Sequence, residues 1–245
     1  MIRGLYTAAS GMMVQVSQQE TVTNNLSNSE TNGFKYDLAL QRASAESNVT
    51  RIPRQQQQGV IGRMTLQTLI DSIHTSHAEG VGIETGRALD LAIAGRGFFA
   101  VETPQGIRYT RNGAFTLDAE RYLVTEQGYR VLGNQGPLQL PAGEVQIQER
   151  GQIFVDGEAV GQLRLADFAD LQALRKEGAT LWAAEQGELA FNGEVRQGFL
   201  EGSNVQVAEE MSRMMTALRL YESNQRVLQA HDQLTGKAVN EIGSL

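Results

Sequence analysis

The C-terminal end of the chain constrains the fold most, because it reads as one long helix. Residues 201–245 contain no proline, and their apolar side chains recur at alternating steps of four and three residues. This is the heptad spacing of a helix that packs along one narrow seam. Ser203 and Gln206 match a capping box, and Glu209 and Glu210 lie where the helix dipole favours negative charge. The predicted seam residues are Val207, Met211, Met214, Leu218, Tyr221, Gln225 and Leu228.

A second helix is predicted at the N-terminus, in a segment of residues 1–35. Apolar side chains fall on one side of this helix, at spacings of three, four and their multiples. The stripe consists of Leu5, Ala9, Met12, Val16 and Leu26. It is narrow, and Gln19 and Thr23 interrupt it, which is more typical of a helix-packing seam than of a broad core face. An asparagine cluster ends the helix, and Asn32 and Gly33 are expected to turn the chain because both tolerate left-handed backbone conformations.

Between the two helices the apolar spacing changes from a period near 3.6 to a period of 2. Leu91 and Ile93 alternate with smaller or polar residues, and glycine-containing turns separate further strand-like runs. Asn112-Gly113 lies between two such runs and predicts a tight hairpin. Residues 80–200 are therefore expected to form an antiparallel β domain. Residues 36–79 contain a QQQQ run beside proline and glycine and are expected to form an extended connector.

The predicted fold class is mainly β with α, a central antiparallel β domain flanked by N- and C-terminal helices that pair as a coiled-coil-like core. What covers the two stripes stays open at this point. The helices can pair only with each other, the methionine-rich stripe can be ordinary core, or both helices can also pack against further copies. The narrow seams and the Gln-, Asn-, Ser- and Thr-rich outer faces favour the last interpretation. A contact between unlike surfaces that does not close generates a helical filament.

Composition gives no support to nucleic-acid binding or to membrane insertion. The formal net charge is -7, with no Lys/Arg cluster that could neutralise phosphates. The absence of cysteine excludes disulfides and thiolate metal sites. The N-terminus lacks the long apolar run of a secretory signal or a membrane span. A surface- or carbohydrate-binding β module with helical oligomerisation ends is a different possibility, but it would need exposed aromatic residues, and these make up only 6% of the chain.

Two local patterns resemble ligand sites but are better explained structurally. The run GRGFFA at 95–100 formally matches a dinucleotide fingerprint, yet it continues as a strand where that fingerprint needs a helix. A tight bend is the simpler explanation. Asp71, His74 and His77 could share one face of a helix, but two histidines without a further ligand cluster are weak support for a metal site. We therefore expect no catalytic residue, cofactor, metal ion or small-molecule substrate.

Five sequence blocks resemble the bacterial flagellar basal-body rod proteins of the FlgF/FlgG type, in the order in which that family carries them. The blocks are IRGLYTAASGM (2–12), TNNLSNSETNGFK (23–35), LDLAIAGRGFFAV (89–101), YTRNGAF (109–115) and LEGSNV (200–205). The resemblance implies a structural subunit of the rod without an active site. Its terminal helices would pack in the inner tube and its β domain would face outward. Implied partners are further copies, other rod and hook subunits, and the flagellar type III apparatus, which would export the chain to the basal body without a cleaved signal.

On this interpretation the two apolar stripes form the assembly interface of an axial drive shaft that transmits torque and encloses the export channel. The resemblance extends to two kinds of rod protein. The short run from residue 151 to residue 205 is similar to the proximal-rod FlgF pattern. The N-terminal block and the GFF motif are at least as typical of the distal-rod FlgG. We favour the proximal rod.

Overall fold

The computed structural model describes residues 2–43, 47–50, 60–64 and 68–243. These form two compact units, one of Met1–Leu26, Asp37–His74 and Val207–Leu245 and the other of Ser27–Tyr36 and Thr75–Gln206. The elements of the first unit are α1 (Ile2–Ser27), β1 (Asp37–Ala43), β2 (Ser47–Thr50), β3 (Val60–Met64), β4 (Thr68–Thr75) and α2 (Val207–Gly243). The two terminal helices predicted from the sequence are therefore confirmed.

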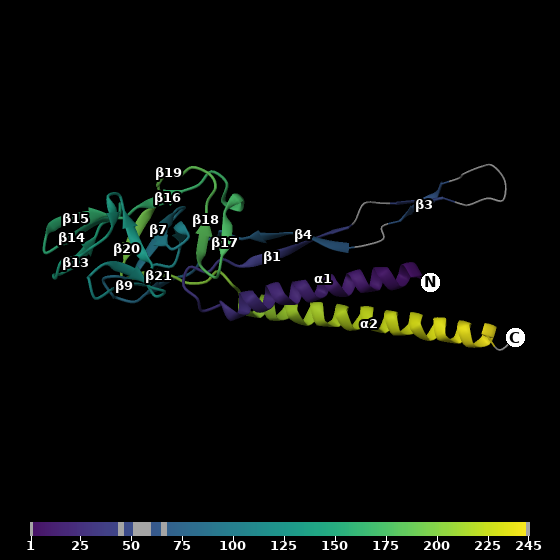
Figure 1. Ribbon diagram of the computed structural model, residues 1–245. Coiled ribbons are helices and arrows are strands. Elements are labelled where there is room, and N and C mark those ends of the chain that lie inside the picture. The colour runs from purple at the N-terminus through teal and green to yellow at the C-terminus, as the bar shows by residue number, and fades with distance from the viewer. Residues whose placement is uncertain (1, 44–46, 51–59, 65–67, 244–245) are drawn as a thin grey trace. The chain divides into compact units, whose positions relative to one another are not determined.

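Helices α1 and α2 lie side by side and run antiparallel (Figure 1). A Cβ atom on Gly4 would lie 2.6 Å from the His231 ring, and one on Gly11 would lie 2.9 Å from the Asn224 amide. Both glycines leave room for these side-chain ends, and a larger residue at either position would make the His231 or Asn224 side chain shift. At the other end of the pair, the Asn25 side chain donates a hydrogen bond of 2.9 Å to Glu210 Oε2.

The start of α2 differs from the sequence prediction. The helix begins at Val207 rather than near Ser203. The Ser203 hydroxyl accepts a bond from Val205 N at 3.3 Å, so it stabilises the turn before the helix and does not cap it. Glu209 and Glu210 do lie in the first turn of the helix, as predicted.

The segment expected to be an extended connector contains β1 to β4. Strand β1 pairs with β4, and β2 pairs antiparallel with β3. The buried Asn25 side chain attaches β1 to α1, because its amide donates to Asp37 O at 2.8 Å and accepts from Asp37 N at 2.9 Å. An asparagine amide can take the place of a backbone peptide in such a pair of bonds. The QQQQ run lies outside the described residues.

The second unit is an antiparallel β domain built around a curled sheet. Its elements are β5 (Gly82–Glu84), β6 (Leu91–Ala94), β7 (Phe98–Thr103), β8 (Gly106–Thr110), β9 (Phe115–Leu117), β10 (Leu123–Thr125), β11 (Arg130–Gly133), β12 (Gly136–Pro137), β13 (Val145–Ile147), β14 (Gln152–Val155), β15 (Glu158–Gln162), β16 (Leu165–Asp167), a 3-10 turn (Leu171–Ala173), β17 (Arg175–Glu177), β18 (Leu181–Ala183), β19 (Leu189–Ala190), β20 (Glu194–Gln197) and β21 (Phe199–Glu201). The order of the main path is β17-β18-β8-β7-β11-β10-β9. The late strands return to the early ones, since β20 pairs with β6 and β21 with β5.

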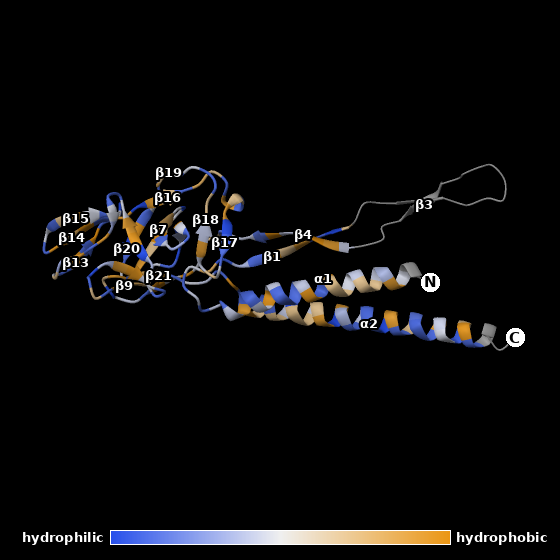
Figure 2. Cartoon of the chain, in the orientation of Figure 1, coloured by the Kyte–Doolittle hydropathy of each residue, from blue (hydrophilic) through white to orange (hydrophobic). Residues whose placement is uncertain are grey.

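Strand β7 is the centre of this domain and is buried on both faces. It bonds β8 along one edge, and its other edge bonds both β16 and β11. Phe99 and Val101 lie in one hydrophobic cluster, whereas Phe98 and Ala100 lie in a second. This alternation follows from the two-residue period of a strand. It also confirms that the GRGFFA run continues as a strand, and Figure 2 shows hydrophobic residues gathered along the strands of this region.

The predicted hairpin at Asn112-Gly113 is wrong. Strand β8 pairs with β7 and β18, and β9 pairs with β10, so the two flanking runs do not pair with each other. Gly113 instead lies against the backbone of Leu91, whose amide donates to Gly113 O at 3.0 Å. A Cβ atom there would meet Leu91 O at 1.7 Å. The glycine is needed for this close backbone approach and not for a two-residue turn.

A buried ionic cluster joins three distant parts of the β domain. Glu201 accepts from Lys35 Nζ at 2.5 Å and from Arg111 at 3.1 Å, and the three side chains are at most 4% exposed. Gly80 N donates to the same carboxylate at 3.0 Å, and Gly33 N donates to the Glu201 carbonyl at 2.7 Å. Burial lowers the pKa of Lys35, and the attraction of Glu201 opposes that shift. We call Lys35, Arg111 and Glu201 the ionic cluster.

Gly33, where the sequence predicted a turn after α1, has a φ of +69°, in the left-handed region. A Cβ atom on Gly33 would meet the backbone of Arg111 and Asn112 at 2.4 Å, so the turn is packed against the β domain. Gly33→Ala is therefore expected to destabilise that domain through both backbone strain and a clash that side-chain motion cannot relieve.

Gly86→Ala is the matched control for this prediction. Gly86 has a φ of +68°, but a Cβ atom added there would have nothing within 4 Å, so only the strain of about 1–2 kcal/mol should remain. Thermal unfolding of the two purified variants measures the difference. Equal losses of stability would contradict the packed position of Gly33.

His77 gives the β domain a pH-dependent stability. Its ring packs against Trp182 and Phe98, with centroids 5.0 and 6.2 Å apart. Burial, with the nearby charge of Lys35 next in size, lowers the pKa of His77 to about 4. The unfolded chain takes up this proton near pH 6.5, so the contribution of His77 to stability is complete above that pH and is lost as the pH falls towards 4.

We therefore expect the free energy of unfolding of the domain to fall by up to about 3 kcal/mol between pH 7 and pH 4 because of this residue. The partial exposure of the ring makes the actual loss smaller than this upper value. His77→Gln should reduce the dependence of the unfolding free energy on pH between pH 7 and pH 4. The exposed His74 provides the control, because His74→Gln should leave the profile as it is. Thermal unfolding at pH 7 and at pH 4.5 measures both, and an identical slope in the wild type and His77→Gln would refute the assignment.

Candidate assembly surface

The side of α1 that faces α2 is made of small and polar residues. These residues follow steps of four and three, and all are buried or half-buried: Gly4, Ala8, Gly11, Gln15, Gln18, Val22 and Asn25. The side of α2 that faces α1 has the same spacing and comparable burial, in Glu210, Met214, Ala217, Tyr221, Asn224, Leu228 and His231. In an antiparallel helix pair, the numbers of facing residues add up to a constant. Three contacts give the same sum of 235, which fixes the register: Gly4 with His231, Gly11 with Asn224, and Asn25 with Glu210.

The predicted α1 stripe lies one residue beyond this inner side. Leu5, Ala9, Met12, Val16 and Leu26 each follow a residue that faces α2, and none of the five is buried. On α2, Met214, Tyr221 and Leu228 belong to the inner side, whereas Val207, Met211 and Leu218 are exposed. The sequence prediction therefore joined two different sides of α2 in one seam. Glycines at 4 and 11 were the signal for the true inner side, because glycine inside a helix is unfavourable unless close packing requires it.

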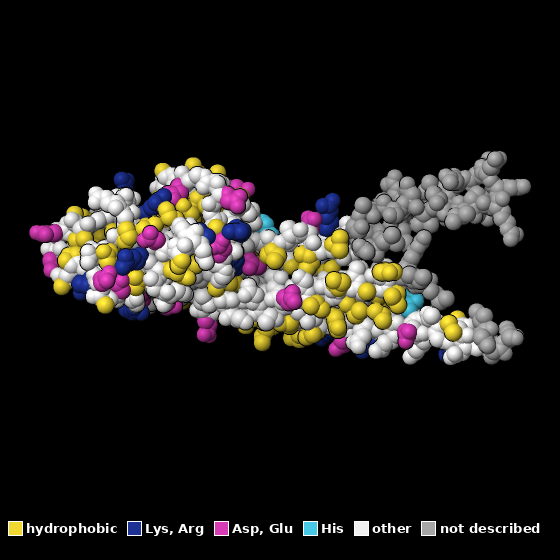
Figure 3. Space-filling model, viewed as in Figure 1, with side chains coloured by type: hydrophobic (Ala, Val, Ile, Leu, Met, Phe, Trp, Pro, Cys, Tyr) yellow, Lys and Arg dark blue, Asp and Glu magenta, His cyan; other side chains and the backbone are white. Residues whose placement is uncertain are grey.

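Large apolar side chains gather on the outer surface of the helix pair instead. Hydrophobic atoms run along the visible face of both helices in Figure 3. Four of these exposed side chains are on α1 and eight are on α2: Leu5, Tyr6, Met13, Val16, Val207, Met211, Met215, Leu218, Leu220, Val227, Leu234 and Val239. Single surface hydrophobics are ordinary, but so many exposed large apolar side chains on one pair of helices indicate surfaces for interaction. We call these twelve residues the outer apolar set.

The inner side is poorly satisfied as a packed interface. Gln15 Oε1 and His231 Nδ1 on this side, and Gln19 Nε2 next to it, are buried without a hydrogen-bond partner among the described residues. Each such group costs stability, because it has lost water and gained nothing in its place. These unsatisfied groups weaken the contact within the helix pair, and the twelve side chains of the outer apolar set stay available for other contacts.

The residues considered in the sequence as a metal site do not form one in the described part of the chain. Asp71 and His74 lie on strand β4 rather than on a helix, and no group of three potential ligands comes together among the described residues. Neither α1 nor α2, over its described residues, has an apolar stretch long enough to cross a membrane.

Comparison with known proteins matches three family descriptions along the chain. Residues 5–35 match "Flagella basal body rod protein", residues 92–155 match "Flagellar hook protein FlgE/F/G D1 domain", and residues 196–241 match "Flagellar basal body rod FlgEFG protein C-terminal". The first and last matches contain most of α1 and α2, and the middle match contains the central strand β7.

Individual relatives cover the chain from end to end. The flagellar basal-body rod protein FlgG of Bacillus subtilis is 33% identical over 264 residues, which is 98% of this chain and 99% of the relative. The FlgG protein of Borreliella burgdorferi is 35% identical, with 98% of each chain covered. The FlgF protein of Caulobacter vibrioides is 30% identical over the full length of both chains. The chain therefore belongs to the family of flagellar basal-body rod proteins.

Proposed function

We propose that this protein is a structural subunit of the bacterial flagellar basal-body rod and that it polymerises through α1 and α2. The observation that carries the proposal is the outer apolar set on two helices, of which α1 brings mainly small and polar residues to their mutual contact. These side chains are 39–75% exposed in a single subunit, so burying the exposed part of each would contribute a fraction of the roughly 1.5–3 kcal/mol that full burial gives. Contact between unlike faces of successive subunits builds an open helical array, which is the geometry of an axial shaft.

In this proposal the terminal helices extend their pairing into a coiled-coil-like inner tube. The tube transmits torque by packing and encloses the export channel, and the chain has no catalytic role. The assembly interface comprises Leu5, Ala9, Met12, Val16 and Leu26 on α1 and Val207, Met211, Met214, Leu218, Tyr221 and Leu228 on α2. Asn32 and Gly33 turn the chain from the tube to the β domain. Partners are further copies, other rod and hook subunits, and the type III apparatus that would export the chain without a cleaved signal.

Within the rod we propose the proximal part, on the similarity of the run from residue 151 to residue 205 to the FlgF pattern. Relatives named FlgG and FlgF both span the chain, so their identity to it does not discriminate between the two positions.

The test is to delete the gene in its host, restore it with a tagged copy, and isolate basal bodies. Non-motile deletion cells, restored motility and the tag within purified rods are the expected results. Gold labelling of the tag should fall on the rod near the membrane-embedded ring. A label at the distal end would move the subunit to the distal rod, whereas motile deletion cells with complete rods would overturn the structural role itself.

A further inference from the structure

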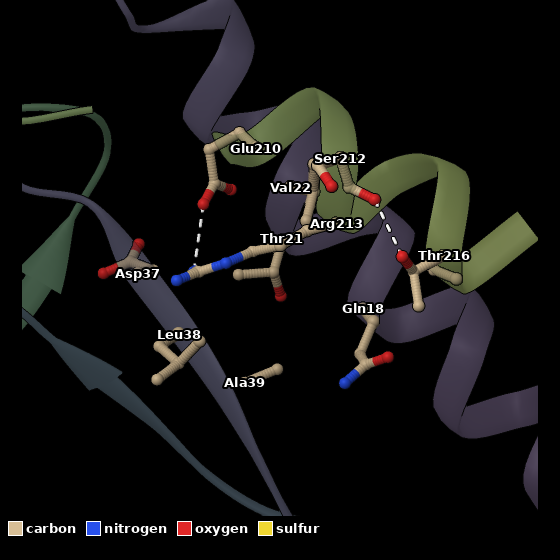
Figure 4. A pocket seen from close by; sticks show the side chains of 11 residues that line it. Gln18, Thr21, Val22, Asp37, Leu38, Ala39, Glu210, Ser212, Arg213 and Thr216 are labelled. Atoms are coloured by element: carbon tan, nitrogen blue, oxygen red, sulfur yellow. Dashed lines mark hydrogen bonds and ion pairs between the residues drawn. The ribbon is translucent and has the colours of Figure 1, made fainter. Parts of the chain in front are cut away.

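A cavity of about 230 Å³ opens between α1, α2 and β1 (Figure 4). All of its lining residues belong to the unit that contains both helices. Val22 of α1, Ala39 of β1 and Ala217 of α2 are buried residues of its wall. Gln18 and Thr216 lie at its edge, on opposite helices. The volume far exceeds the roughly 15 Å³ that a single water needs, so the cavity can take a whole side chain.

The charged groups around the cavity already have partners within the chain. Glu210 binds Asn25 at 2.9 Å and Arg213 at 3.0 Å, and Arg213 also pairs with Glu209 at 2.6 Å. A charged ligand would therefore have to displace an existing ion pair. An uncharged, largely apolar group would instead lie against the buried walls without disturbing these pairs, and the cavity favours that class of occupant.

Met13 of α1 has the properties of such an occupant. Its side chain is 75% exposed, the largest fraction in the outer apolar set, so it is not seated in the cavity of its own chain. Methionine is long, flexible and polarizable, and it fills irregular apolar spaces well. Tyr6 and Val16 are also exposed on α1, and Met211 and Met215 are exposed on α2 beside the cavity residues Ser212 and Thr216. A second helix seated there would thus bury apolar side chains on both partners.

We propose that this cavity is a socket for Met13 of a second copy of the chain. The projecting side chain and the socket are different surfaces of one subunit, so each copy can give one contact and receive another. A dimer formed by such a head-to-tail contact still has one free Met13 and one free socket, so the contact can continue along a polymer. The inference rests on the proposed function and specifies one of its subunit contacts.

Cysteine crosslinking in assembled rods tests the contact without interference, because the chain has no native cysteine. One copy carries Met13→Cys and a second copy, of different tag size, carries Thr216→Cys. Both are expressed in cells that lack the wild-type gene, and the purified basal bodies are oxidised. A disulfide between the two sizes can only be intermolecular. The expected result is a crosslinked dimer from the mixture that is lost when either copy is present alone.

Basal bodies that contain both copies without that dimer would overturn the socket while leaving the rod function intact. A dimer that forms with Tyr6→Cys or Met211→Cys but not with Met13→Cys would identify another occupant and also overturn it. Absence of even the wild-type chain from basal bodies would instead refute the proposed function. The three results are therefore distinguishable.

A filling variant provides a second readout if a cysteine copy is not incorporated. Thr216→Trp places a large side chain at the cavity. Thr235→Trp is its matched control, because both threonines are exposed on α2 and both donate to the carbonyl four residues earlier, at 2.9 and 2.8 Å. Loss of motility in Thr216→Trp alone supports the socket. Normal motility of Thr216→Trp, or equal loss in both variants, overturns it.

Discussion

Leu218→Asp is expected to abolish rod assembly while leaving the thermal unfolding of the purified chain almost unchanged. Leu218 is 44% exposed and belongs to the outer apolar set, so its replacement should alter the stability of the free subunit by only about 0.5 kcal/mol. In a packed interface, the same carboxylate would have to be buried without a partner or protonated, at a cost of several kcal/mol. Every subunit of the polymer would repeat that cost. Motility, rod completion in isolated basal bodies and the melting curve of the purified variant together measure the effect.

Gln229→Asp separates the effect of position from the effect of charge. Gln229 is an exposed polar residue of the same helix and is not part of the outer apolar set. Cells with this variant should assemble rods, because the residues one turn before and one turn after Gln229 on the helix are all polar. Complete rods in the Leu218→Asp strain would count against the outer apolar set as the assembly surface. A collapsed melting curve would show that Leu218 supports the fold of the subunit itself.

The second large effect is expected in the ionic cluster. Glu201→Ala leaves Lys35 and Arg111 buried together without a counter-charge, and breaking a buried pair in this way typically costs about 3–5 kcal/mol. For a domain of this size that corresponds to a fall in melting temperature on the order of 10 °C. It should appear in calorimetry of the purified chain at neutral pH. The loss concerns folding, so assembly should fail as a consequence.

Glu177→Ala is the control with the same connectivity. Glu177 also joins two cations, Arg108 at 2.6 Å and Arg175 at 2.6 Å, but its side chain is 27% exposed where that of Glu201 is 4% exposed. Glu177→Ala leaves Arg175 70% exposed and Arg108 13% exposed, so water reaches them more than it reaches the two cations of the ionic cluster. The melting temperature of this variant should therefore fall less than that of Glu201→Ala. A similar fall in both variants would mean that burial does not set the strength of the Glu201 contacts.

Local signals in the sequence predicted the local parts of this structure. Heptad-like spacing predicted both terminal helices, the asparagine cluster with Gly33 predicted the turn after α1, and the run from Phe98 predicted a strand and excluded a dinucleotide site. Each of these features depends on residues close together in the chain. The apolar stripes of both helices were visible for the same reason, although the predicted seam of α2 combined residues from two sides of that helix.

The true inner side of the helix pair was missed because its chemistry is unusual. A search for apolar residues at heptad spacing passes over Gly4, Gly11 and Asn25, which are small or polar, and selects residues one position away. The hairpin at Asn112-Gly113 failed for a related reason. The dipeptide permits a tight turn, but pairing of β8 with β7 and of β9 with β10 decided which strands meet, and no local pattern contains that information.

The ionic cluster also has a consequence for the order in which the β domain folds. Lys35 and Glu201 are 166 positions apart, and the final strands β20 and β21 pair with β6 and β5 near the start of the domain. Contacts between residues so far apart in the chain stabilise the fold only after a long loop has closed, which costs entropy. The domain should therefore fold in milliseconds to seconds rather than microseconds. A chain that ends before Glu201 has neither the strand partner of β5 nor the counter-charge for Lys35 and Arg111. Native topology therefore becomes accessible only when almost the whole polypeptide is present, and a shorter chain can form local helices and hairpins but not the contacts that close the domain.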